Sequence, residues 1–185
     1  MAFRIIAAAA ALALAPTLAQ AEEFRLDSRF TDADGDFVAD APTDPTQWID
    51  PDTLVFAYTP VEDPSVYVEV WSEFVDHLAE VTGKKVQYFP VQSYAAQQEA
   101  LRAGRVHVAA VNAGGVATAV ACAGLVPFAI ATSFDGEYGY EMEIITWPGS
   151  GIEKVEDPKG RQLAFTTETS HSGFKAPSSL RSAAG

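Results

Sequence analysis

The sequence predicts an α/β fold, with a parallel-rich sheet covered by helices, from three observations. Short apolar runs rich in β-branched and aromatic residues alternate with stretches of helical spacing from Thr53 onward. The connections between them are short. Glycine and proline mark many of their ends. Strands and helices that alternate in this way build a parallel sheet with helices on its faces.

The first 21 residues have the three-part plan of a secretory signal peptide. A cation at Arg4 precedes an apolar run from Ile5 to Ala15, Pro16 ends that run, and small residues follow. The run is shorter than the roughly 20 residues that a membrane-spanning helix needs. We therefore expect export to the periplasm, with cleavage after about Ala21.

The chain is strongly acidic, with a formal net charge of -13. Removal of residues 1–21 takes away one cation and no acid, so the charge becomes -14. This excess argues against a nucleic-acid partner and against an anionic membrane surface, because both prefer basic patches. An anionic ligand would have to be held by local dipoles. Cys122 is the single cysteine, so no internal disulfide is expected, and its neighbours favour a buried apolar role.

Residues 22–52 are rich in Asp, Pro and Thr and predict an acidic, extended lead-in that wraps around a domain. Within it, "DADGDFVAD" places carboxylates at Asp32, Asp34, Asp36 and Asp40. Oxygen ligands at alternate positions suit calcium, but the glycine of this stretch is not where an EF-hand loop needs it. A solvated acidic loop and a structural calcium site both stay open.

The first half of the fold follows in a regular order. The expected elements are a strand in "TLVFAYT" (53–59), a helix from Pro64 to Gly83, a strand in "KKVQYFPV" (84–91), a helix capped by Ser93 that runs to Gly104, a strand in "VHVAAV" (106–111) and a small-residue helix from Gly114 to Cys122. Asp63 with Pro64 forms the expected start of the first helix.

Three further strands are predicted, followed by a last helix. The strands are "LVPFAIA" (125–131), "YEMEIIT" (140–146) and "RQLAFTT" (161–167), and the helix begins at about Ser172. The loop "WPGSG" (147–151) is the expected boundary between two lobes, because Gly and Pro punctuate it and a new strand and helix follow.

Ligands of open parallel sheets bind beyond the carboxyl ends of strands, near helix N-termini. The polar residues expected there are Tyr58, Thr59, Ser93, Tyr94, Asn112, Tyr138, Tyr140, Thr169, Ser170, His171 and Ser172. The sharpest group lies in "TETSHSGFKAP" (167–177), where backbone N–H groups at a helix start and serine hydroxyls can hold a tetrahedral anion. The alternative is that Ser170 or Ser172 only caps its helix and that the tyrosines only pack.

Enzyme motifs are missing from the sequence. There is no G-x-S-x-G elbow, no H-E-x-x-H, no Walker loop and no G-x-G-x-x-G after a strand. The three histidines, His77, His107 and His171, do not have metal-ligand spacing. We therefore expect a protein that is not an enzyme and has no cofactor.

The stretch from Thr53 to Pro177, above all "GIEKVEDPKGRQLAF" and the following "TSHSG", resembles the solute-binding proteins of phosphate, phosphite and phosphonate ABC importers. The resemblance implies a class II periplasmic binding fold, with lobe 1 at residues 53–147 and a second lobe that begins at 148 and is incomplete at 185. It also implies a monomer that captures a phosphorus oxyanion and delivers it to a membrane permease.

The same resemblance implies the ligand contacts. They are Tyr94, Tyr140, Ser170, His171 and Ser172, with Tyr58 and Thr59 on the first loop of the cleft. His171 stands where relatives often have Thr or Asn, so the preferred anion stays open. Because family members continue beyond this point, we expect the region after Gly151 to be poorly stabilised. The alternative function is a remnant or interaction module without a transport role, stabilised by calcium at the acidic loop.

Overall fold

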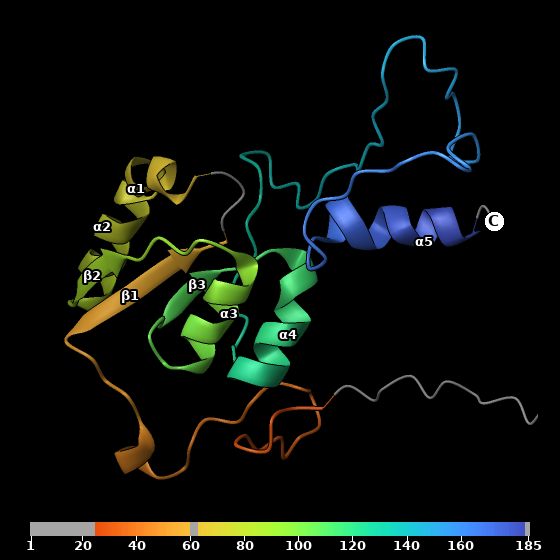
Figure 1. Cartoon of the computed structure of the whole chain (residues 1–185). Helices are drawn as coiled ribbons and strands as arrows, with labels where there is room; N and C mark the ends of the chain where they lie inside the picture. Colours follow the sequence, from red (N-terminus) through yellow and green to blue (C-terminus); the bar gives the residue numbers. More distant parts are fainter. Residues whose placement is uncertain (1–24, 60–62, 184–185) are drawn as a thin grey trace, which may run out of the picture.

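The protein is described by a computed structural model that covers residues 25–59 and 63–183, so the predicted leader lies outside the described residues. Its centre is a parallel sheet of three strands in the order β2-β1-β3 (Figure 1). β1 spans Thr53–Tyr58, β2 spans Lys85–Tyr88 and β3 spans Val108–Ala110. β1 pairs in parallel with both neighbours, which confirms the predicted α/β class.

Helices cover both faces of this sheet, as predicted (Figure 1). α1 (Tyr67–Val70) and α2 (Ser72–Thr82) form one layer, and α3 (Tyr94–Arg102) and α4 (Ala113–Ala123) form the other. A last helix, α5 (Ala176–Ala183), follows a π-helical turn, η3 (His171–Lys175). Two short 3-10 turns, η1 (Pro45–Gln47) and η2 (Pro64–Val66), complete the described elements.

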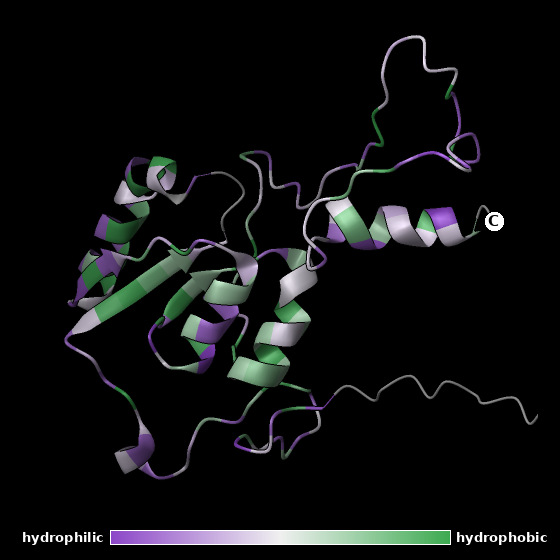
Figure 2. Cartoon of the chain, in the orientation of Figure 1, coloured by the Kyte–Doolittle hydropathy of each residue, from purple (hydrophilic) through white to green (hydrophobic). Residues whose placement is uncertain are grey.

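Successive side chains of β1 point to opposite faces and enter two small cores. On one face Ala57 packs with Ala100 of α3 and with Val91 and Val106, which flank that helix in the chain. On the other face Phe56, which is 1% exposed, has its ring centroid 4.9 to 6.0 Å from those of Trp71, Phe74 and Tyr88. Full burial of one such ring contributes about 2 to 3 kcal/mol. β1 and β3 are accordingly among the most hydrophobic segments in Figure 2.

Local signals set the helix ends as predicted. Asp63 accepts a hydrogen bond from the Ser65 N–H at 2.9 Å, and Ser93 accepts one from the Ala96 N–H at 3.1 Å. Gly83 ends α2 in the left-handed conformation, with φ of 67°, which glycine adopts without strain. The predicted single helix from Pro64 is interrupted at Trp71, where the backbone leaves helical angles.

The prediction of three strands after residue 124 is wrong for the described chain. Residues 125–131, 140–146 and 161–167 contain no strand, and their apolar side chains lie largely in solvent. Phe128 is 79% exposed and Ile145 is 86% exposed. A strand forms only where a neighbour supplies hydrogen-bond partners. All three segments are loops in the described residues, and those at 140–146 and 161–167 lie apart from the sheet (Figure 1).

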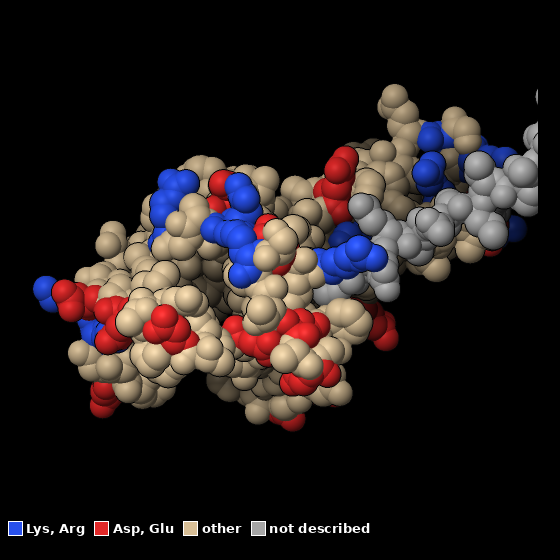
Figure 3. Space-filling model, turned by 90° about the horizontal axis from the view of Figure 1, so that it is seen from below, with Lys and Arg blue, Asp and Glu red and all other residues tan. Residues whose placement is uncertain are grey.

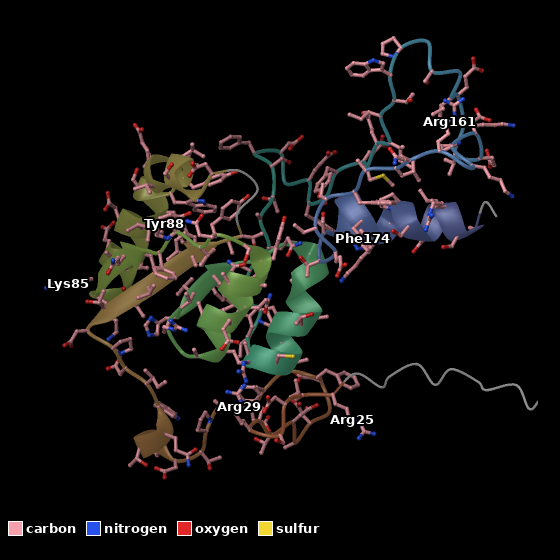
Figure 4. All side chains as sticks on the ribbon, viewed as in Figure 1. Arg25, Arg29, Lys85, Tyr88, Arg161 and Phe174 are labelled. Atoms are coloured by element: carbon pink, nitrogen blue, oxygen red, sulfur yellow. The ribbon has the colours of Figure 1, made fainter. Side chains whose placement is uncertain are left out.

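The lead-in crosses beneath the two helices of the α3 layer. Arg29 points from it toward the ends of α3 and α4 (Figure 4), and its Nη2 donates to the Cys122 carbonyl at 2.8 Å. The Phe30 ring covers Gly124, the residue that ends α4. Cys122 is exposed, so the prediction of a buried thiol is wrong: the core-facing side of α4 is formed by Ala119 and Val120 instead.

No helix in residues 25–59 or 63–183 combines the length and the apolar character that crossing a bilayer requires.

Candidate functional site

The hydroxyl-rich turn at residues 167–175 forms the start of the last helix. Ser170 is its N-cap, because the Ser170 Oγ accepts from the Gly173 N–H at 3.0 Å. The Lys175 N–H donates to the Ser170 carbonyl at 3.1 Å, five residues back, so the first turn is a π-turn. Single π-turns are frequent at functional sites, because they redirect side chains within a helix.

Ser172 differs from Ser170 in its partner. Its Oγ lies 2.8 Å from the hydroxyl of Tyr140, which comes from the long loop between α4 and the turn. The contact is exposed to solvent, and Tyr140 itself is 81% exposed. Two predicted ligand residues that are 32 positions apart are therefore brought together, and both hydroxyls stand where a ligand from solvent can reach them.

Thr59, at the end of β1, belongs to a buried network. Its hydroxyl donates to the Gln97 Oε1 at 2.5 Å and accepts from the Asn112 N–H at 3.3 Å. The Gln97 Nε2 in turn donates to the Ala110 carbonyl at 3.1 Å. Thr59 is 2% exposed and Gln97 is 1% exposed. This network joins the ends of β1 and β3 to α3, so the hydroxyl of Thr59 is already committed to partners within the protein.

Tyr58 and Tyr94 form the aromatic side of the same strand ends. The Tyr58 ring lies 5.0 Å from that of Tyr67 and 5.1 Å from that of Trp71, between ring centroids. Partial burial raises the pKa of Tyr58, and the nearby Tyr67 and Tyr94 hydroxyls add to the effect. Tyr58 and Tyr94 are both half-buried. The raised pKa keeps the Tyr58 hydroxyl protonated at physiological pH, so it can donate a hydrogen bond.

The turn is docked directly on the start of α4. The Asn112 Nδ2 donates to the Thr169 carbonyl at 3.0 Å, and the Lys175 Nζ donates to the Gly114 carbonyl at 2.7 Å. A Cβ placed on Gly114 would lie 2.0 Å from the Thr169 oxygen and 2.9 Å from the His171 nitrogen. The N-terminus of α4 and the N-terminus of the turn therefore lie side by side.

The predicted site residues thus fall into two groups. The turn group contains Tyr140, Ser170, His171 and Ser172, with the His171 side chain exposed. The strand-end group contains Tyr58, Thr59 and Tyr94, and Asn112 links it to the turn group through Thr59 and Thr169. Sequence reasoning missed Lys175 and Gln97. Gln97 was detectable as a polar residue three positions before the core residue Ala100 on one helix face.

A hollow of about 490 Å³ lies at the loop that carries Tyr140. Six consecutive residues, Gly136–Glu141, line it. Because a single loop forms the whole lining, this hollow is a bend of that loop and differs from a cleft between two lobes.

The acidic loop is the place where a metal ion could bind. Carboxylate oxygens of Asp32, Asp34 and Asp36 lie within 4.8 Å of one another. Both carboxylate oxygens of Asp32 accept backbone N–H groups, from Gly35 at 2.8 Å and from Phe37 at 3.2 Å. Asp40 turns away from this group and accepts the Ala33 N–H at 2.9 Å. A solvated acidic loop and a structural calcium site both stay open for this segment.

Charge on the face seen from below is divided into small groups. Figure 3 shows a dense group of acidic side chains there, with lysines and arginines in separate places and no continuous basic surface.

Comparison with known proteins identifies the chain's relatives. The family described as "ABC transporter, phosphonate, periplasmic substrate-binding protein" matches residues 56–185. A crystal structure of a binding protein component of an ABC phosphonate transporter from Pseudomonas aeruginosa has the same fold, with a TM-score of 0.59 and 24% sequence identity. The match covers 68% of this chain and 43% of that chain, so the chain spans less than half of its relative. The family is one of binding proteins and not of enzymes, and because the family match extends over most of the chain, this protein belongs to the periplasmic substrate-binding proteins of phosphonate ABC transporters.

Proposed function

We propose that this chain is the extracytoplasmic solute-binding component of an ABC importer and that its ligand is a phosphorus oxyanion. The candidates are a phosphonate, phosphite and phosphate. The predicted mode of action is capture in the periplasm, by a monomer, and delivery to permease subunits in the membrane. Membership of the phosphonate-binding family supports the phosphonate among the three anions.

The observation that carries the proposal is the convergence of two helix N-termini beside the Tyr140–Ser172 pair. The start of α4 and the start of the π-turn are close enough that a Cβ on Gly114 would collide with Thr169 and His171. Each helix N-terminus carries the equivalent of about half a positive charge. Backbone N–H groups and hydroxyls in that field can bind phosphoryl oxygens in a chain whose net charge is -13.

The proposed contacts are the predicted ones, with unequal roles. Ser172, Tyr140 and the exposed His171 offer groups to the anion, and Ser170 shapes the turn as its cap. Tyr94 and Tyr58 extend the site along the strand ends. Thr59 does not contact the anion, because its buried hydroxyl is hydrogen-bonded to Gln97 and to the Asn112 N–H. Its role is to fix these two residues beneath the site. The lobes at residues 53–147 and 148–185 stay part of this proposal.

Calorimetric titration of the purified protein tests the proposal. The ligands are methylphosphonate, phosphite and phosphate, with sulfate as a tetrahedral anion that lacks phosphorus. Three or four charge-assisted hydrogen bonds support a dissociation constant in the micromolar range or below, at roughly 1.5 to 3 kcal/mol each before ordering costs. The absence of heat with all three phosphorus anions would refute the proposed function. Equal binding of sulfate would refute its restriction to phosphorus.

A further inference from the structure

Two side chains outside the predicted contact set hold the hydroxyl-rich turn on the sheet domain. We infer that Asn112 and Lys175 are positioning residues, which fix the turn at residues 167–175 against the start of α4 in the absence of ligand. Their role in ligand affinity rests on the proposed function. The docking itself is independent of it, because the contacts form within the protein alone.

Asn112 is placed for this role by the end of β3. It occupies the N-cap position of α4 but makes no capping hydrogen bond with its side chain. Its Nδ2 donates instead to the Thr169 carbonyl at 3.0 Å, 57 residues away in the chain. Its backbone N–H donates to the hydroxyl of Thr59, which is itself held by the buried Gln97. Asn112 therefore connects the turn to the most buried polar network described.

Lys175 makes the second contact from the turn itself. Its Nζ donates to the Gly114 carbonyl at 2.7 Å, 61 residues away. The helix dipole disfavours a cation near a helix N-terminus, so the charge of Lys175 does not stabilise α4 through the dipole. It ties the π-turn to α4, and it adds a positive charge close to the two converging N-termini.

Gly114 provides the space that these two contacts need. Its backbone φ is not among the left-handed values of the described glycines, so an L-residue could adopt its conformation. A methyl group there would nevertheless meet the Thr169 oxygen at 2.0 Å. Helix propensity alone would favour alanine at this position. Glycine is therefore explained by the close approach of the turn, which leaves no room for a side chain.

Hydrogen exchange of the ligand-free protein tests the docking. Asn112→Asp places another residue that is favoured at N-cap positions at the start of α4, but it replaces the donor to the Thr169 carbonyl by a carboxylate oxygen. Lys175→Met removes the second contact at an exposed position. We expect both variants, and Gly114→Ala, to raise exchange about tenfold or more at the Gly173 and Lys175 amides, with β1 unchanged. Lys175→Arg, which keeps a positively charged donor, should leave exchange at the Gly173 amide as slow as in wild type.

Charge-matched controls separate docking from net charge. Gln162→Glu adds one negative charge and Lys154→Met removes one positive charge on the exposed loop before the turn. Neither should change exchange at Gly173. Wild-type exchange in Asn112→Asp and Lys175→Met would overturn the inference, as would equal effects in the controls.

Titration with methylphosphonate gives the second readout. Asn112→Asp and Lys175→Met should raise the dissociation constant about tenfold, with the melting temperature of the sheet domain unchanged. If wild-type protein binds none of the phosphorus anions, the proposed function fails, and the exchange data still decide the docking. If the anion binds and both variants bind it as tightly as wild type, the positioning role fails and the proposed function stands.

Discussion

Ser170 and Ser172 stand two residues apart in one turn, yet they have different partners. Ser170 faces inward to the N–H of Gly173, and Ser172 faces the hydroxyl of Tyr140. The two explanations that the sequence leaves open for this turn, a helix cap and an anion contact, can therefore both hold, each at its own serine.

Ser172→Ala should weaken anion binding about tenfold or more, because one charge-assisted hydrogen bond is lost, with little change in melting temperature. Ser170→Ala should instead lower the stability of the turn by about 1 kcal/mol, as loss of an N-cap does. Titration and thermal melting of each variant distinguish the two roles. Ser179→Ala, at an exposed position of α5, is the matched control. An unchanged affinity and a lower melting point for Ser172→Ala would assign Ser172 to capping alone.

At the scale of elements, the lead-in is fastened by one arginine to the ends of two helices. Besides the Cys122 carbonyl, Arg29 reaches the Arg102 carbonyl of α3 at 3.5 Å, and its Nε pairs with Asp27 at 2.9 Å. The Asp27 N–H donates to the Ala121 carbonyl at 2.7 Å. A cation at helix C-termini is favoured by the dipole and by orphan carbonyls.

Arg29→Gln should loosen the lead-in, and chymotrypsin should then cleave after Phe30 several-fold faster. The hydrogen bond from the Arg29 side chain is the main cause that lowers the pKa of Asp27. Because the pKa of Asp27 is lowered in the folded protein, its pairing with Arg29 stabilises the lead-in at pH above the ordinary carboxyl pKa. This stabilisation is lost as the pH falls through the lowered pKa of Asp27. In acid, where chymotrypsin is inactive, cleavage is measured with pepsin, and a fall in pH should accelerate it more for wild type than for Arg29→Gln. Arg105→Gln is the charge-matched control, and equal cleavage rates in all three proteins would contradict the role of Arg29.

Elements with complete local signals could be predicted from the sequence, and those that depend on distant partners could not. The N-cap at Ser93 and the left-handed glycine at Gly83 depend only on residues close to them in the chain. The start of α3 and the end of α2 therefore lie where they were expected. The apolar runs after residue 124 carry a strand pattern but lack a neighbouring strand among the described residues. The same holds for the candidate site. The serine-rich turn could be predicted from neighbouring residues, whereas the contact of Lys175 with Gly114 joins residues 61 positions apart and could not.

At the scale of the whole molecule, the buried apolar contacts of the described residues are concentrated in the sheet and the helices that cover it. In residues 125–165 many large apolar side chains are exposed, among them Phe134, Ile145 and Trp147. Phe165 has one described ring partner, Phe174, at 5.4 Å between centroids. A segment with few buried contacts opens at low free energy, whereas the sheet opens only with the global unfolding of its core.

Hydrogen exchange followed by mass spectrometry should show this contrast. We expect protection factors of the amides at Leu163, Ala164 and Phe165 to be about 100-fold or more below those of Phe56 and Ala57 in β1. The comparison is internal, because both sets of amides are measured in the same molecule. Protection at residues 163–165 that equals the protection of β1 would show that this region has a stable core of its own.

β1 lies between β2 and β3 and is the first of the three strands to be synthesised. Thr53 pairs with Lys85, and Phe56 pairs with Val108, 52 residues later. At a translation rate of about 5 to 20 residues per second, β1 waits roughly 3 to 10 seconds for its second partner. During that interval the nascent chain exposes a strand rich in apolar side chains with an unpaired edge, which is the kind of segment that chaperones cover. The order of synthesis therefore sets the shortest time for which the central strand of this protein needs such protection.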